Sequence, residues 1–177
     1  ALQKEQVASL EQALQHVAFV PQGIPHAQGV RMYEGAEGLK TVLSYILDHA
    51  EGVCIFGDGD AFQNLVPGWT ETYSAERAAR GIKARILLKG TPSAIAAAKR
   101  LHATSNAKSS LTKMRVLPES YAITGGFDVW GNTAIFYSFD QKNIAAVVES
   151  KPIATMMKTV FEILWSLAET YDRTLLR

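Results

Sequence analysis

The sequence predicts an α/β fold in which a mixed β-sheet is flanked by helices on both faces. Three short apolar runs, each followed by small or acidic residues and a helix-forming segment, occupy Val30–Tyr33, Val53–Phe56 and Ala84–Leu88. Strand-helix units in series indicate parallel strands covered by helices. The second half contains strands joined by short turns, which favours antiparallel hairpins and therefore a mixed sheet.

Composition restricts the class of protein. The chain has 177 residues, of which 47% are hydrophobic, so it can bury one good core. Its 18 basic and 17 acidic residues form no long runs, so nothing in the composition indicates a nucleic-acid groove or a surface for anionic membranes within this segment. Cys54, the single cysteine, lies in an apolar run and fits a reducing cytoplasm. We expect a cytoplasmic protein without a membrane span.

Three segments are predicted along the chain. Residues 1–20 form a helical connector or dimerisation arm, 21–29 a proline-containing linker, and 30–177 the main domain. In the arm, apolar residues spaced 3-4-3 predict either a two-stranded dimer seam or packing against the chain's own domain. These residues are Val7, Leu10, Leu14 and Val17. Because the chain starts at Ala1 with sequence typical of a protein interior, we expect a piece of a longer protein.

Further elements follow from periodicity and from helix-capping signals. An apolar stripe predicts a helix over Gly35–Ala50, and Asp60 with Gln63 resembles a capping box. Two more helices are expected after Pro67-Gly68 and from Pro92 onwards. The expected elements after Gly68 are the helices Trp69–Arg80 and Ala94–Ala103, the loop Ser105–Ser110, and the strands Met114–Leu117, Ala122–Thr124, Thr133–Phe139 and Ile144–Glu149.

The last helix, starting at Ser150-Lys151-Pro152, is apolar on much of its circumference. One face contains Ile163 and Leu167, and another contains Phe161 and Trp165. We expect the chain's own sheet to bury one face and a second subunit to bury the other, which predicts a homodimer.

Known catalytic and cofactor motifs are missing. The chain has no P-loop, no Gly-x-Ser-x-Gly elbow and no cysteine-histidine set for zinc. Gly57 and Gly59 give only half of a dinucleotide fingerprint, and the neighbouring Asp58 and Asp60 would repel pyrophosphate. No cofactor or metal is predicted.

Polar residues follow the first three predicted strands: Glu34, Asp58 with Asp60, and Lys89. Ligands of such sheets bind beyond the carboxyl ends of the strands. Carboxylates accept hydrogen bonds from sugar hydroxyls, while aromatic rings cover the apolar face of a sugar. The sequence therefore predicts a site for a neutral, hydroxyl-rich ligand, with covering rings from Trp69, Trp130 and Tyr137.

Structural roles compete with ligand binding at each of these polar positions. Asp60 could cap the following helix and Asp58 could be a turn residue. Lys89 could be a solvated strand end, and Glu34 could cap the helix after it. The two aspartates could also serve acid-base catalysis or bind a divalent cation, which we rank lower.

Several segments resemble the C-terminal region of TrmB-type transcriptional regulators. The most specific is Tyr-Glu-Gly-Ala-Glu-Gly-Leu-Lys at 33–40, followed by an amphipathic helix and Ile55-Phe56-Gly57. Residues 80–87 (Arg-Gly-Ile-Lys-Ala-Arg-Ile-Leu), 148–153 and 161–168 add to the resemblance. It extends over nearly the whole chain from Val30.

This resemblance implies an effector-binding and dimerisation domain of phospholipase D-like fold. In the family a winged-helix DNA-binding domain and a helical connector precede it; Ala1–Ala18 resembles the connector, and the winged helix is absent from these residues. Several members sense sugars. DNA contact would then be made only through that preceding domain.

Phospholipase D chemistry needs a His-x-Lys motif. The residues two positions after the four histidines are Ala18, Gln28, Glu51 and Thr104. We therefore expect a non-enzymatic regulatory domain that binds a sugar or a similar small polar effector. One alternative is a metal-dependent hydrolase or phosphodiesterase using Asp58 and Asp60. The other is a ligand-free dimerisation module whose pocket is filled by Trp69 or Trp130.

Overall fold

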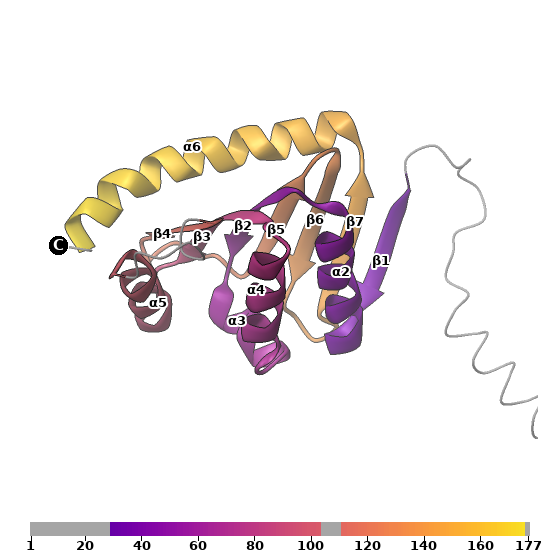
Figure 1. Ribbon diagram of the computed structural model, residues 1–177, viewed down its shortest axis with the longest axis horizontal. Coiled ribbons are helices and arrows are strands. Elements are labelled where there is room, and N and C mark those ends of the chain that lie inside the picture. The colour runs from indigo at the N-terminus through magenta and orange to yellow at the C-terminus, as the bar shows by residue number, and fades with distance from the viewer. Residues whose placement is uncertain (1–28, 104–110, 176–177) are drawn as a thin grey trace, which may run out of the picture.

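The computed structural model describes residues 29–103 and 111–175, which build a seven-stranded sheet with helices on both faces (Figure 1). The fold class predicted from the sequence is thereby confirmed. The predicted arm and its seam, Val7, Leu10, Leu14 and Val17, lie outside the described residues. The strands are β1 (Val30–Glu34), β2 (Gly52–Gly57), β3 (Lys83–Lys89), β4 (Thr112–Leu117), β5 (Gly125–Trp130), β6 (Thr133–Ser138) and β7 (Ile144–Glu149).

The strand order is β1-β7-β6-β5-β2-β3-β4. Only β2, β3 and β4 pair in parallel; all other neighbours are antiparallel. The expectation that the first three strands end side by side is therefore wrong for β1. It pairs with β7 at the far edge, because the β5–β6–β7 meander is inserted between β1 and β2.

The predicted strand Ala122–Thr124 is also wrong, because these residues are loop and β5 starts at Gly125. Gly125 and Gly126 belong to the strand rather than to a turn. The β5–β6 hairpin turns instead at Gly131-Asn132, where Gly131 has a φ of +44°. A positive φ is adopted at little cost by glycine, which suits the tight two-residue connection.

Two helical layers enclose the sheet (Figure 1). One face is covered by α2 (Gly35–His49), α3 (Gly59–Leu65), α4 (Trp69–Ala79) and α5 (Pro92–Ala103); of the described helices, α6 (Lys151–Leu175) alone covers the other face. Strand alternation divides the apolar residues accordingly: Ile135 packs with Leu39 and Ile46 of α2, whereas Phe127 packs with Phe161 of α6. Among the described helices, none combines the length and apolarity required to cross a membrane.

Helix α6 is fixed to the sheet by both apolar and charged contacts. Phe161 is fully buried, and the guanidinium of Arg85 lies 5.0 Å from its ring centre while pairing with Glu162. Arg115 Nη1 donates to the Trp165 carbonyl at 2.7 Å. The buried inner face of α6 is thus as predicted. On its outer face, large apolar side chains are exposed, namely Met156, Ile163 and Leu167. Their burial by a second subunit stays a prediction.

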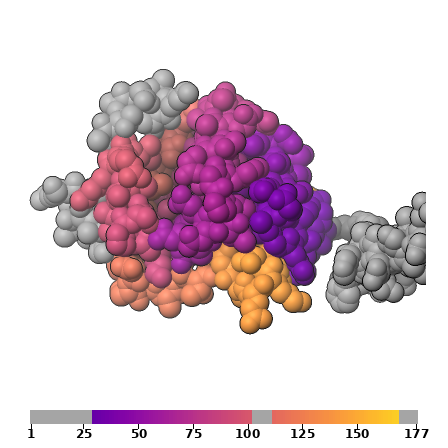
Figure 2. Space-filling view, turned by 90° about the horizontal axis from the view of Figure 1, so that it is seen from below, coloured from indigo at the N-terminus to yellow at the C-terminus, as the bar shows by residue number. Residues whose placement is uncertain are grey.

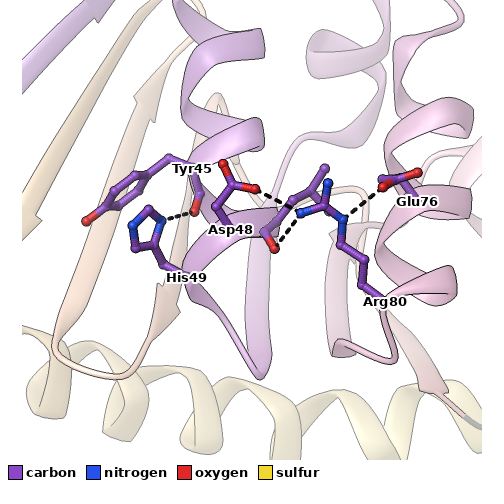
Figure 3. Close-up of polar contacts among 6 residues, drawn as sticks. Tyr45, Asp48, His49, Glu76 and Arg80 are labelled. Carbon is purple, nitrogen blue, oxygen red and sulfur yellow. Dashed lines mark hydrogen bonds and ion pairs between the residues drawn. The ribbon is translucent and has the colours of Figure 1, made fainter.

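Arg80 joins the ends of α4 and α2 (Figure 3). Its Nη1 atom donates to Asp48 at 2.8 Å and to the Leu47 carbonyl at 3.1 Å, while Nε donates to Glu76 at 2.8 Å. Gly81 follows with a φ of +73°, so the chain can reverse into β3. These contacts set the position of α4, which supplies part of the site described below.

Replacing Phe161 by alanine should lower the free energy of unfolding by about 3–5 kcal/mol, because a fully buried aromatic side chain is removed and a cavity is left. The matched control is Thr155→Ala, on the same helix, which should change stability by about 0.5 kcal/mol or less because Thr155 is exposed and is not one of the apolar residues of the outer face. Urea unfolding measures both variants. Equal losses would contradict the packing of α6 on the sheet.

Candidate functional site

A cavity of about 580 Å³ lies between the sheet and the helices α3, α4 and α5. This is the face seen in Figure 2, where the surface is hollowed between α5 and the α3–α4 segment. The volume lies within the range of about 300–1,000 Å³ that is typical of small-molecule sites. Most of the lining side chains are apolar, including Leu43, Ile55, Phe62, Ile86, Leu88, Met114 and Phe139.

The polar floor of the cavity is built by Asp128, Tyr137 and Tyr73. Tyr137 Oη donates to Asp128 Oδ2 at 2.8 Å. The hydroxyl of Tyr73 is buried and has no hydrogen-bond partner among the described residues. An unpaired buried polar atom has a free-energy cost, so one beside a cavity is an open position for a ligand atom.

Burial shifts the protonation of these groups. It raises the pKa of Asp128 from 3.8 to about 7, although the hydrogen bond from Tyr137 acts in the opposite direction. The pKa of Tyr137 is raised well above its usual value, first by burial and then by the charge of Asp128. Burial, followed by the same carboxylate, also raises the pKa of Tyr73. No described lysine or arginine forms an ion pair with Asp128.

Strand alternation explains why an aspartate lies in the core. Phe127 and Val129 point to the α6 side of the sheet, so Asp128 between them must face the other helical layer. Its register neighbours are Ile55 on β2 and Ile135 on β6. No polar partner comes from these neighbouring positions, so Asp128 relies on the Tyr137 hydroxyl.

Close approach of β2 and β5 forms one border of the cavity. Gly57 has a φ of +156°, and a Cβ atom placed on it would lie 2.7 Å from the Gly125 carbonyl oxygen. A larger residue would force the two strands apart at this point. Gly57 and Gly126 both line the cavity, so their small size shapes its wall.

At the mouth, Asp58 caps α3: its Oδ1 atom accepts from the amides of Asp60 and Ala61 at 3.1 and 3.0 Å. The expectation that Asp60 is the cap is wrong, because the helix starts two residues earlier than that cap requires, at Gly59. Asp60 instead accepts a hydrogen bond from Ser93 Oγ and so links α3 to the start of α5. Lys89 Nζ lies 4.0 Å from Asp58 Oδ2.

The structure brings some of the predicted site residues together and separates others. Asp58, Asp60 and Tyr137 line the cavity, and Lys89 lies beside Asp58. Glu34 does not line the cavity, because β1 is at the other end of the sheet. It stands at the N-cap position of α2 without making a side-chain capping bond.

Neither tryptophan proposed as a cover lines the cavity. The Trp69 ring stacks on Tyr73 with centroids 6.2 Å apart, so it packs against one of the floor residues. Trp130 is buried in the core beside Tyr45. Trp130 faces the same helical layer as Asp128, two residues further along β5, but it packs against α2 instead of lining the opening.

Sequence reasoning missed Asp128 and Tyr73. A signal existed for Asp128, because it is the one charged residue of the run Gly-Gly-Phe-Asp-Val-Trp. The strand was instead placed at Ala122–Thr124, which hid that pattern. Tyr73 lies in an ordinary amphipathic helix, and its missing hydrogen bond is visible only in three dimensions. In the part of the chain that the structure describes, no group of three or more metal-ligand side chains is gathered.

No family model matches this sequence. A search of curated proteins likewise finds no match. Solved structures with low sequence identity do share the fold. The archaeal chromatin protein TrmBL2, described as binding DNA in a novel mode, aligns with a TM-score of 0.57 and 16% identity over 94% of this chain. The aligned part is 63% of TrmBL2, so this chain spans less than two thirds of that protein.

Two further structures align with most of their own length. NucT from Helicobacter pylori gives a TM-score of 0.56 at 12% identity, covering 79% of this chain and 97% of NucT. The phospholipase D family member Nuc from Salmonella typhimurium gives 0.54 at 14% identity, covering 79% and 95%. The predicted phospholipase D-like fold is thus confirmed, and the same fold occurs in the archaeal chromatin protein TrmBL2.

Asp128 should make stability depend on pH. The native state keeps its proton up to about pH 7, whereas the unfolded chain releases it near the ordinary pKa of 3.8. The stability contributed by the neutral carboxyl is fully present below the unfolded pKa. It is lost between these two pKa values, at up to about 1.4 kcal/mol per pH unit, and is gone once the pH has risen through the folded pKa. Asp128→Asn, a neutral isostere, should abolish this slope.

Urea unfolding of both proteins between about pH 4 and pH 8 measures the difference. Subtracting the two curves cancels the surface pairs of Glu149 and Glu162, whose pKa values are lowered by their hydrogen bonds. Parallel curves would show that Asp128 is ionised throughout.

Replacing Asp58 should lower the stability of the protein by removing the cap of α3. Asp58→Ala should cost about 1 kcal/mol, because two amides at the start of α3 lose their acceptor. Asp58→Asn should cost much less, since asparagine caps helices nearly as well as aspartate. Thermal unfolding of the two variants checks this. If both changes cost the same, the charge of Asp58 rather than its capping bonds matters.

Proposed function

We propose that this chain is the ligand-sensing, dimerising domain of a TrmB-like transcriptional regulator and that it catalyses no reaction. The observation with most weight is the cavity, which combines apolar walls with a hydroxyl that has no partner. A sensor needs such a cavity to hold a small molecule without converting it. The structural likeness to TrmBL2 supports a role in gene regulation.

The alternative of a hydrolase has less support, although the fold is shared with the phospholipase D family member Nuc. The chain lacks any His-x-Lys sequence. Asp58 is engaged as a helix cap and Asp60 by Ser93, so neither has the freedom expected of a nucleophile or a base. The alternative of a ligand-free module predicts that Trp69 or Trp130 fills the cavity, and neither lines it.

Signal transfer would use the elements that form the cavity. A ligand bound against the floor contacts α3, α4 and α5 together, and α4 is tied to α2 through Arg80. A ligand that binds one arrangement of these helices more tightly shifts the population towards it. We infer that the shift reaches a DNA-binding domain through the N-terminal arm, and that the exposed apolar face of α6 contacts the second subunit of a homodimer.

Filling the cavity should abolish ligand binding while the fold is kept. Ala97 lines the cavity from α5, and Ala97→Phe should remove the rise in melting temperature that ligands cause in the wild type. Lys99→Phe adds the same ring at an exposed position on the same helix and should respond like the wild type. A screen by differential scanning fluorimetry measures all three. Equal ligand responses in Ala97→Phe and the wild type would place binding elsewhere.

The enzymatic alternative is tested separately with bis(p-nitrophenyl) phosphate in the presence of magnesium or manganese. We expect no turnover by the wild type, because the nucleophile motif is missing. Turnover that disappears in both Asp58→Asn and Asp60→Asn would refute the proposal and establish the hydrolase.

A further inference from the structure

We propose that the ligand of this cavity is an amphipathic organic amine, whose ammonium group binds between Asp128 and the hydroxyl of Tyr73. The inference rests on the proposed function, since it names the chemical class of the effector. It replaces the neutral, hydroxyl-rich ligand expected from the sequence.

Two oxygen atoms on the floor of the cavity are free to accept hydrogen bonds from a ligand. Tyr137 occupies Asp128 Oδ2, which leaves Oδ1 without a hydrogen bond among the described residues. The Tyr73 hydroxyl also has no partner, and it is near enough to Asp128 for that carboxylate to raise its pKa. An ammonium group has three donors and no acceptor, so it can satisfy both oxygens at once.

The charged side chains around the cavity are mostly acidic. Four carboxylates line the cavity, at Asp58, Asp60, Glu71 and Asp128, whereas Arg100 is the one cationic side chain that the described lining contains. Asp128 is the most buried of these four carboxylates, and no described cation pairs with it. Arg77, the buried arginine of α4, donates instead to the Ile82 carbonyl and to Thr112 Oγ1. A buried carboxylate gains strongly from a cationic partner, so the site favours a positive ligand over an uncharged one.

The wall of the cavity is apolar and partly aromatic. Three rings pack together around Tyr137, the hydrogen-bond partner of Asp128: the ring centre of Phe62 lies 5.8 Å from that of Tyr137 and 5.9 Å from that of Phe139, and the latter two stack at 6.1 Å. Aromatic faces attract cations, and the aliphatic wall suits a hydrocarbon body. A sugar would bring many hydroxyls against this wall, where they would find too few partners.

The experiment compares amines with neutral molecules of the same shape on the full 177-residue chain. The probes are 2-phenylethylamine against 2-phenylethanol and hexylamine against hexan-1-ol, together with glucose and maltose, measured by isothermal titration calorimetry. We expect each amine to bind at least about tenfold more tightly than its alcohol, because the alcohol cannot pair with the carboxylate. The sugars should not bind.

Two floor variants add a readout that a purely structural role would not give. Asp128→Asn should remove the preference for amine over alcohol. Tyr73→Phe should raise the melting temperature of the free protein, because it deletes a buried hydroxyl without a partner, yet lower the affinity for the amine several-fold, by about three- to tenfold. A residue that only packs would lose stability and leave affinity unchanged. Tyr73→Phe also provides a test if Asp128→Asn fails to fold.

Proton release supplies an independent check. The groups that face Asp128 or share its cavity are Tyr73, Glu71 and the nearby Arg77 of α4, Tyr137 of β6, Asp58 and Asp60 at the start of α3, and Arg100 of α5. Because an ammonium favours ionised Asp128, amine binding below about pH 7 should release a proton, visible as a buffer-dependent binding enthalpy. Alcohols should release none.

The possible failures are distinguishable. If alcohols or sugars bind as tightly as amines, or if Asp128→Asn keeps the preference for amines, the amine inference is overturned while the ligand-sensing function stands. If no probe of either kind binds, the inference is overturned and the proposed function loses its main support.

Discussion

The burial of one carboxylate is the constraint on which the site depends. Asp128 lies in the middle of the sheet, faces the helical layer and receives a single hydrogen bond, from Tyr137. Tight packing of apolar side chains over it would leave Oδ1 with neither solvent nor a partner, at a large free-energy cost. The cavity framed by α3, α4 and α5 leaves that oxygen accessible to a ligand. The Tyr73 hydroxyl beside this cavity also has no hydrogen-bond partner among the described residues, which has a free-energy cost in the native state.

Contacts outside the cavity fix the helices and strands that frame it. On the other face, α6 packs Phe161 into the core and is fixed by Arg85 and Arg115. On the cavity side, the first turn of α3 is capped by Asp58, and α4 is tied to α2 by Arg80. In the proposed sensor, a ligand held against this floor would change the balance of forces among several helices at once. The shared fold shows that the same scaffold also occurs in the phospholipase D family member Nuc and in a DNA-binding protein, so the side chains of the site, rather than the fold, decide function.

Local patterns predicted much of the architecture. The apolar stripe of α2, the parallel pair β2–β3 and the breaks at Gly68 and Gly81 follow from periodicity and turn chemistry within a few residues. Strand order did not, because the pairing of β1 with β7 joins residues that are far apart in the sequence, and the local pattern of β1 contains no record of that partner. The same limit explains the site: Asp58, Asp60 and Tyr137 were anticipated, whereas Glu34 was placed wrongly with β1. Asp128 was missed because the strand was placed at Ala122–Thr124 instead of Gly125–Trp130. Tyr73 was missed because a missing hydrogen bond is a property of the packed structure.

We infer that Asp128 receives the ligand. Following the ¹³Cγ chemical shift of its carboxyl by NMR through a pH titration, with and without 2-phenylethylamine, is the sharpest test of that inference. The account predicts a midpoint at about 7 in the free protein and a clear shift to lower pH when the amine is bound. A midpoint near the ordinary value of 3.8, or one that the amine does not move, would contradict it.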